Sequence, residues 1–152
     1  MLGRLARWLR LLGHDTFYCS SLEDSRLLIV AREEGRTILT RDTRLVKVKG
    51  LQNFLLLREN DPFKQLKTVI TTFNLYPAGR RGFEMPPSIH SRCSLCNSPL
   101  EEVPIEQAKP FVHDYVFRTS AAIKKCVPCS KFYWKGTHHE KLRKKLLEIL
   151  YN

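Results

Sequence analysis

The sequence predicts an α/β domain with a largely parallel sheet, followed by a small cysteine-rich module and a basic C-terminal helix. Helical and extended patterns alternate as far as residue 73, and two Cys-x2-Cys pairs follow. Apolar residues then recur at helical spacing among the lysines at the end of the chain. We therefore expect the α/β domain over residues 1–76, a linker over 77–88, and the cysteine-rich module with its helix over 89–152.

The chain opens with a predicted helix over residues 2–12. Its leucines recur at helical spacing, and Gly13 suits the left-handed position that often ends a helix. Residues 16–19 form a short apolar run that predicts a strand. We expect Cys19, at the end of this run, to be a small buried apolar side chain.

A second helix and a second strand are predicted next. Ser21 or Asp24 can cap the helix, which ends at Gly35. The compact β-branched run at residues 37–40 then predicts a strand, and this strand leads directly to Asp42.

The remainder of the first domain predicts a connection, a strand and a helix. Residues 45–49 read as a short helical or irregular connection, and the apolar run at 53–57 is consistent with a strand buried on both faces. Asp61 and Pro62 suit the N-cap and first position of a helix. The residues expected to face the core along this helix are Phe63, Leu66, Val69, Ile70 and Phe73.

Two cysteine pairs, Cys93-x2-Cys96 and Cys126-x2-Cys129, indicate a metal site. Each pair can direct two thiolates at one ion, and four such ligands suit tetrahedral zinc. The alternative is a pair of disulfides, which requires an oxidising compartment. The chain opens with several arginines and no secretory apolar run, so we expect a cytoplasmic protein with a structural Zn²⁺ site.

The charge of the chain is strongly basic and unevenly distributed. The formal net charge is +11, with basic residues in excess over residues 1–83 and 124–152 and acidic residues in excess over 84–123. Such a balance favours a polyanionic partner, most simply nucleic acid. No apolar stretch approaches the ~20 residues that span a bilayer, so the sequence does not predict a membrane protein.

Several carboxylates are expected at one edge of the predicted sheet. Asp42 follows the strand at residues 37–40, and Glu59 and Asp61 follow the strand at residues 53–57. Asp24 lies at the start of the helix that precedes the first of these strands. Functional groups gather at the C-terminal ends of parallel strands, and grouped carboxylates suit Mg²⁺ or Mn²⁺. Each also has a structural reading, because Asp24 and Asp61 can cap helices and Asp42 can pair with a neighbouring arginine.

Several motifs, in order along nearly the whole chain, resemble the mutator-type C-terminal RNase domain family, in which a PIN-like nuclease is fused to a zinc ribbon. The matching stretches are Met1 to Thr16, Thr40-Arg41-Asp42, Asp61-Pro62 with Gln65-Leu66, and Cys126-x2-Cys129 followed by Tyr133-Trp134-Lys135-Gly136-Thr137-His138.

The resemblance implies a PIN-like three-layer α/β domain, a small zinc-ribbon module and metal-dependent hydrolysis of RNA phosphodiesters. Asp24 matches the acidic position that opens the second helix, and Asp42 matches the aspartate of the Thr-Arg-Asp motif. Asp61 falls in the acidic stretch after the next strand. The resemblance therefore implies Asp24, Asp42 and Asp61 as catalytic residues, with Asp24 and Asp42 as ligands of Mg²⁺ or Mn²⁺.

One family feature does not match. The family has a first strand ending in an aspartate just upstream of the Met-Leu-Gly segment, whereas this sequence starts at Met1. The expectation is either that the sequence is a piece of a longer chain or that part of the catalytic set has been lost. The alternative function is therefore a catalytically impaired adaptor that binds RNA or a ribosome, and a third is a DNA- or protein-binding zinc-ribbon module.

Basic residues in both halves are candidates for phosphate contacts. Arg4, Arg7 and Arg10 share one arc of the first helix, although such an arc can also be a solvated face. The aromatic residues between Lys131 and Lys135 suit single-stranded RNA, or they pack the ribbon. The residues that we expect to bind RNA are Arg4, Arg7, Arg41, Arg44, Lys131 and Lys135.

Overall fold

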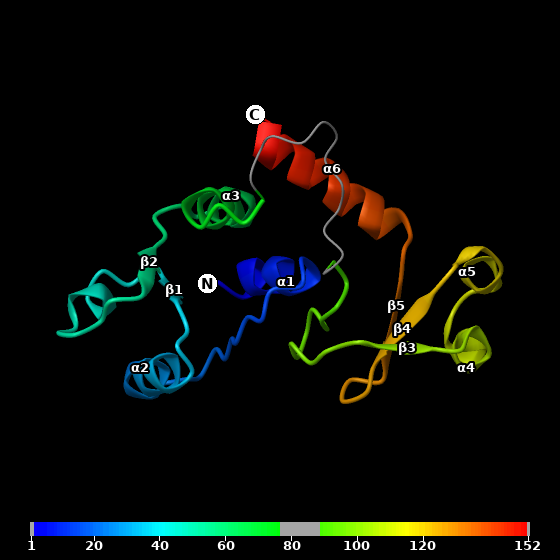
Figure 1. Ribbon diagram of the computed structural model, residues 1–152, viewed down its shortest axis with the longest axis horizontal. Coiled ribbons are helices and arrows are strands. Elements are labelled where there is room, and N and C mark those ends of the chain that lie inside the picture. Colours follow the sequence, from blue (N-terminus) through cyan, green and yellow to red (C-terminus); the bar gives the residue numbers. More distant parts are fainter. Residues whose placement is uncertain (1, 77–88, 152) are drawn as a thin grey trace. The chain divides into compact units, whose positions relative to one another are not determined.

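The computed structural model describes residues 2–76 and 89–151 and shows a mixed α/β protein (Figure 1). It contains a parallel sheet of two strands and a separate antiparallel sheet of three strands. A small parallel sheet is thus present, and the three-layer PIN-like arrangement stays a prediction. The predicted linker over 77–88 lies outside the described residues.

The chain divides into two compact units, which are described separately. The first comprises Met1–Leu5 and Tyr18–Pro77, and the second comprises Ala6–Phe17 and Ala78–Asn152. The elements up to the linker are α1 (Gly3–Leu11), α2 (Asp24–Glu33), β1 (Ile38–Thr40), the 3-10 helix η1 (Leu45–Lys47), β2 (Phe54–Leu56) and α3 (Pro62–Thr72). Those after it are β3 (Glu101–Val103), α4 (Ile105–Ala108), η2 (Lys109–Phe111), α5 (Asp114–Thr119), β4 (Ile123–Cys126), β5 (Lys131–Trp134) and α6 (Thr137–Tyr151).

In the first unit, β1 and β2 form a parallel pair with Ile38 opposite Phe54. A small apolar core supports this pair, with Ala31 of α2, Ile38 and Leu45 buried together. The prediction that the second strand is buried on both faces is wrong, because Phe54 is 37% exposed. Among the described residues β2 pairs with β1 alone, and the nearest fully buried side chain is Leu57, directly after the strand.

The start of α3 confirms the predicted cap. Asp61 is the N-cap, and its Oδ1 accepts hydrogen bonds from the backbone N–H groups of Phe63 at 3.0 Å and Lys64 at 2.9 Å. The buried face of α3 consists of Gln65, Leu66, Val69 and Ile70. Phe73 was expected to continue this face, but it lies past the last helical turn and is exposed.

Two predictions for the chain before α2 are wrong. Residues 16–19 form no strand, because side chains rather than a partner strand bond the backbone of Thr16: its N–H donates to Asn97 Oδ1 and its carbonyl accepts from Arg10 Nε. Cys19 is exposed rather than buried. The N-cap of α2 is Glu23, whose side chain makes no capping bond, so neither Ser21 nor Asp24 has the predicted capping role.

In the second unit, β3, β4 and β5 form an antiparallel meander, with Glu101 opposite Lys125 and Lys125 opposite Phe132. The C-terminal helix α6 is present as predicted, and Leu142 and Leu146 are fully buried along it. Among the described residues, no helix has both the length and the apolar character needed to cross a membrane.

Candidate metal centre and carboxylate edge

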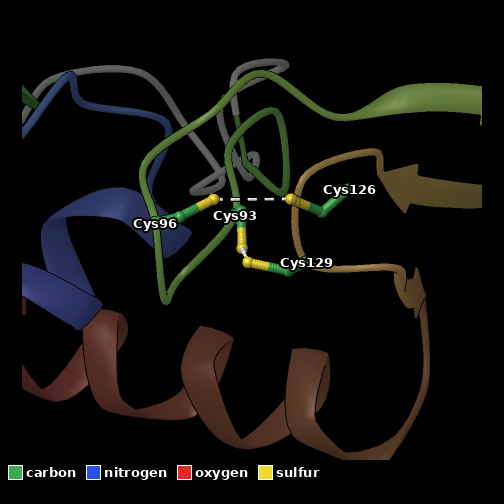
Figure 2. Close-up of side chains that lie close together, drawn as sticks. All are labelled: Cys93, Cys96, Cys126 and Cys129. Carbon is green, nitrogen blue, oxygen red and sulfur yellow. Dashed lines mark hydrogen bonds between the residues drawn. The ribbon is translucent and has the colours of Figure 1, made fainter.

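The four predicted cysteines meet at one point of the second unit, as Figure 2 shows. Their Sγ atoms all lie within 4.8 Å of one another, with Cys93 and Cys129 at 3.9 Å and Cys96 and Cys126 at 3.4 Å. Zinc–sulfur bonds of about 2.3 Å in a tetrahedron place the sulfur atoms about 3.8 Å apart, so the donor set fits zinc. A disulfide requires about 2.05 Å between sulfur atoms, and all four cysteines are free.

Each cysteine pair is followed by a residue in the left-handed conformation. The residue directly after each pair, Asn97 and Ser130, has a positive φ of 74° and 53°. The Asn97 N–H donates to the Cys93 carbonyl at 3.0 Å, and the Ser130 N–H donates to the Val127 carbonyl at 3.3 Å. This left-handed step, which non-glycine residues adopt uncommonly, curls each loop so that both of its thiols point to the same side.

Hydrogen bonds orient two of the sulfur atoms. The Tyr133 hydroxyl lies 3.1 Å from Cys93 Sγ, and the Ser98 hydroxyl lies 3.4 Å from Cys96 Sγ. Contacts to ligand atoms from a second layer of residues fix the ligand orientation and tune its affinity for metal. We expected the aromatic residues between Lys131 and Lys135 either to pack the ribbon or to stack on RNA bases. The sequence therefore did not predict the contact of Tyr133 with the metal site.

The protonation of the four thiols is uneven. Although burial opposes ionisation, hydrogen bonds from Ser98 and neighbouring thiols lower the pKa of Cys96 to about 6. Burial raises the pKa of Cys126 to about 12. Four adjacent thiols therefore cannot all ionise by themselves, and a divalent cation supplies the charge that lets them do so. The cluster could bind a structural zinc ion.

Arg10 of α1 connects this centre to the N-terminal segment of the same unit. Its Nη1 donates to the carbonyls of Leu95 at 2.6 Å and Ser94 at 3.3 Å, between the two cysteines of the first pair. Burial lowers the pKa of Arg10, and the neighbouring Cys96 thiolate opposes that shift. The expectation that Arg10 contacts phosphate is wrong, because the side chain is buried and bound to these carbonyls.

A second contact joins the same two segments. Asn97 donates from Nδ2 to Asp15 Oδ1 at 2.7 Å, and Arg92 forms an ion pair with Asp15 at 3.6 Å. Asn97 also accepts the Thr16 N–H. The left-handed Asn97 turn is thus tied to the residues that follow α1, and the first cysteine loop is fixed from both of its ends.

Of the predicted carboxylates, Asp42 follows β1, and Glu59 and Asp61 follow β2, whereas Asp24 is the first residue of α2. Asp42 Oδ1 accepts the backbone N–H of Arg44 at 2.7 Å, and its Oδ2 pairs with Arg44 Nη2 at 3.3 Å. These hydrogen bonds lower the pKa of Asp42. The turn pair that the sequence offered as a structural reading of Asp42 is therefore present.

The loops that follow the two strands are in contact. Arg41 Nη2 donates to Asn60 Oδ1, and the Leu57 N–H donates to the Thr40 carbonyl at 2.8 Å. Glu59 lies in the second loop, where its own backbone N–H and the Thr68 hydroxyl bond the carboxylate and lower its pKa.

The expected catalytic aspartates occupy three different positions. Asp24 is the first residue of α2, Asp42 lies in the loop after β1, and Asp61 caps α3. Within residues 2–76 and 89–151, the cysteine cluster is the only set of three or more potential metal ligands with atoms this close. A magnesium or manganese site built from these aspartates stays a prediction.

The expected RNA contacts are mostly accessible. Arg4, Arg7, Arg44, Lys131 and Lys135 are exposed, whereas Arg41 is partly buried. Phe132, between the two lysines, stacks on Phe111 with ring centroids 5.2 Å apart, and Lys125 lies 5.5 Å above the Phe132 ring. Phe132 therefore packs on Phe111, which is 70% exposed, and binding of RNA bases by this aromatic pair stays a prediction. Phe111 gave no sequence signal because it lies 21 positions away, outside the cysteine-rich turns.

Comparison with known proteins gives one match. The family model described as Mut7-C RNAse domain matches residues 1–146. No curated protein matches the chain, and no solved structure matches it.

Proposed function

Because the chain belongs to the Mut7-C RNAse domain family, we propose that it is a metal-dependent ribonuclease of PIN-like type that hydrolyses RNA phosphodiesters. The family assignment itself implies RNA as a substrate or partner. The observation that carries the metal-dependent mechanism is the contact between the loops after β1 and β2, through Arg41 and Asn60. It supports a shared carboxylate edge with Asp42 on one loop and Glu59 and Asp61 on the other.

At this edge Asp42 is the central ligand of the proposed site. Its two oxygens already hold a cation, the Arg44 guanidinium, and the Arg44 side chain is 90% exposed. Arg44 can therefore release Asp42 to Mg²⁺ or Mn²⁺ at little cost and turn to a phosphate of the substrate. Asp24 is the second proposed ligand, and Asp61 is the third proposed catalytic residue. A bound divalent ion supplies charge for the phosphate oxygens and an activated water.

The cysteine cluster has a structural role in this proposal. We expect Cys93, Cys96, Cys126 and Cys129 to hold zinc and to fix the β-meander. Lys131 and Lys135, exposed at the two ends of the β5 region, then offer positive charge to RNA phosphates.

An RNA-binding or ribosome-binding adaptor without cleavage is the alternative. It is favoured by the bonding of the aspartates: Asp42 is paired with Arg44, and Asp61 Oδ1 accepts two backbone N–H groups. Both residues thus have structural roles that need no metal.

Cleavage of labelled single-stranded RNA in Mn²⁺ or Mg²⁺ separates the two functions. We expect cleavage by the unaltered chain, a loss of at least about a hundredfold in Asp42→Asn, and full activity in Asp114→Asn. Asp114 is an exposed acid of the second unit and provides the matched control. RNA binding with no metal-dependent cleavage, or equal cleavage by both variants, would favour the adaptor.

A further inference from the structure

A cavity in the first unit lies at the opposite ends of the strands from the carboxylates. It has a volume of about 190 Å³ and is bordered by the end of α2 and by the loop that leads into β2. Arg36 precedes β1 and Asn53 precedes β2, so these lining residues mark the N-terminal ends of the parallel strands. None of the predicted catalytic residues borders it, whereas Lys49, one of the basic residues after Asp42 that we expect to contact phosphate, does.

Three cations and no carboxylate line the cavity. They are Arg32 and Arg36 from the end of α2 and Lys49 from the loop. Arg36 is bonded to Glu34, which leaves two cations whose charge is not offset in this way. Within the described parts of the chain, the side chains of Arg32 and Lys49 make no ion pair or hydrogen bond. The lining therefore carries a net positive charge.

The C-terminal end of α2 presents little negative partial charge to an anion in this cavity. A helix C-terminus usually presents unsatisfied carbonyl groups and a negative partial charge. In α2 the carbonyls of Val30, Ala31 and Arg32 already accept hydrogen bonds from the chain that follows the helix. The bonded carbonyls leave the positive side chains as the dominant charges at the cavity.

The remaining wall is apolar. Leu28 and Ala31 of α2 line one side, and Val48 and Leu51 line the loop side. The loop is closed by the Leu51 N–H bonding the Val48 carbonyl at 3.2 Å, with Gly50 in a left-handed conformation at φ 84°. This tight turn holds Lys49 at the rim between two apolar residues.

We propose that this cavity binds a nucleoside monophosphate, either free or at the phosphorylated end of an RNA strand. Arg32 and Lys49 bind the phosphate, and the apolar wall accepts the face of the base. The volume is below the usual range of about 300–1,000 Å³ for pockets that enclose a drug-sized ligand, so the cavity can hold no more than one nucleotide, part of which stays in solvent. The site does not depend on cleavage at the carboxylate edge.

Titration of the zinc-loaded full chain with 5′-AMP tests this site. Calorimetry should show saturable binding, and adenosine without the phosphate should bind at least about tenfold more weakly. The double variant Arg32→Gln/Lys49→Gln should weaken AMP binding by at least about tenfold. The control Arg26→Gln/Lys67→Gln removes the same charge from exposed positions outside the cavity and should change affinity by no more than about twofold.

The outcomes are distinct. Absence of saturable AMP binding would overturn the site. Equal weakening of AMP binding by the two double variants would also overturn it, because it would show only a general attraction of AMP to a basic protein. If the amide spectrum shows that Arg32→Gln/Lys49→Gln does not fold, the single variant Lys49→Gln, which changes only the loop, takes its place. It should likewise weaken AMP binding more than the control does. A 5′-phosphorylated tetranucleotide that binds more tightly than AMP identifies an RNA end as the occupant, whereas equal binding identifies a free nucleotide.

Discussion

The guanidinium of Arg10 donates a hydrogen bond of 2.6 Å to the carbonyl of Leu95, which lies between the two cysteines of the first pair. This bond fixes a loop whose metal-binding geometry depends on a left-handed turn at Asn97. Because Arg10 also bonds Ser94 and Thr16, one buried side chain holds both the loop and the segment after α1.

We expect Arg10→Met to destabilise the second unit by about 2–4 kcal/mol, because it removes a charged donor from several carbonyls. Urea unfolding of the zinc-loaded chain measures this change. The control Arg7→Met, at an exposed position of the same helix, should change stability by less than about 0.5 kcal/mol. Equal effects of the two substitutions would contradict the role assigned to Arg10.

Tyr133→Phe should weaken zinc binding by about tenfold or more, because it removes the hydroxyl that bonds Cys93 Sγ and keeps the ring. Competition with a chromogenic chelator measures the affinity. Tyr115→Phe provides the matched control, since Tyr115 is 76% exposed. Unchanged zinc affinity in Tyr133→Phe would show that this contact does not tune the metal site.

Asp61 can be tested for its two roles separately. Asp61→Ala should cost about 1 kcal/mol through loss of the α3 cap, whereas Asp61→Asn keeps a capping oxygen and should fold almost as stably. If Asp61 is also a metal ligand, Asp61→Asn loses RNA cleavage while its thermal unfolding is nearly unchanged. Full activity of Asp61→Asn would restrict the residue to its capping role.

The Asp42–Arg44 pair predicts a pH dependence. Because the pKa of Asp42 is lowered in the folded chain, its contribution to stability is present above the ordinary value of 3.8 and is lost as the pH falls through the lower folded value. Arg44→Gln keeps the backbone hydrogen bond and removes the charged one, so the Asp42 pKa should rise partway toward 3.8. Carboxyl NMR titration measures it, and no rise would contradict the pair.

Local signals predicted much of the fold. The β-branched run before Asp42, the Asp61-Pro62 helix start and the Cys-x2-Cys pairs each carry their structure within a few residues, and all appear as expected. The ion pair of Asp42 with Arg44 was also among the predictions, because it joins positions only two apart in the sequence. The sequence offered this pair as the alternative to a metal-binding role for Asp42.

Contacts between distant positions account for the errors. Residues 16–19 have a strand-like composition, but Thr16 is bonded by Asn97, 81 positions later. Arg10 appears on the same helical arc as Arg4 and Arg7, yet its partners Ser94 and Leu95 are more than 80 positions away. Periodicity in one segment cannot reveal such partners, so a buried structural arginine resembled a phosphate-binding one.

The central claim, a divalent metal site on Asp42, is tested most directly by Mn²⁺ titration of the amide spectrum. Sub-stoichiometric Mn²⁺ should broaden the signals of Asp42 and Glu59 in the unaltered chain and leave them sharp in Asp42→Asn, because a paramagnetic ion relaxes only nearby nuclei. Selective broadening that disappears in the variant is the result we predict. Signals that stay sharp in the unaltered chain, or that broaden equally in Asp42→Asn, would contradict the proposed site.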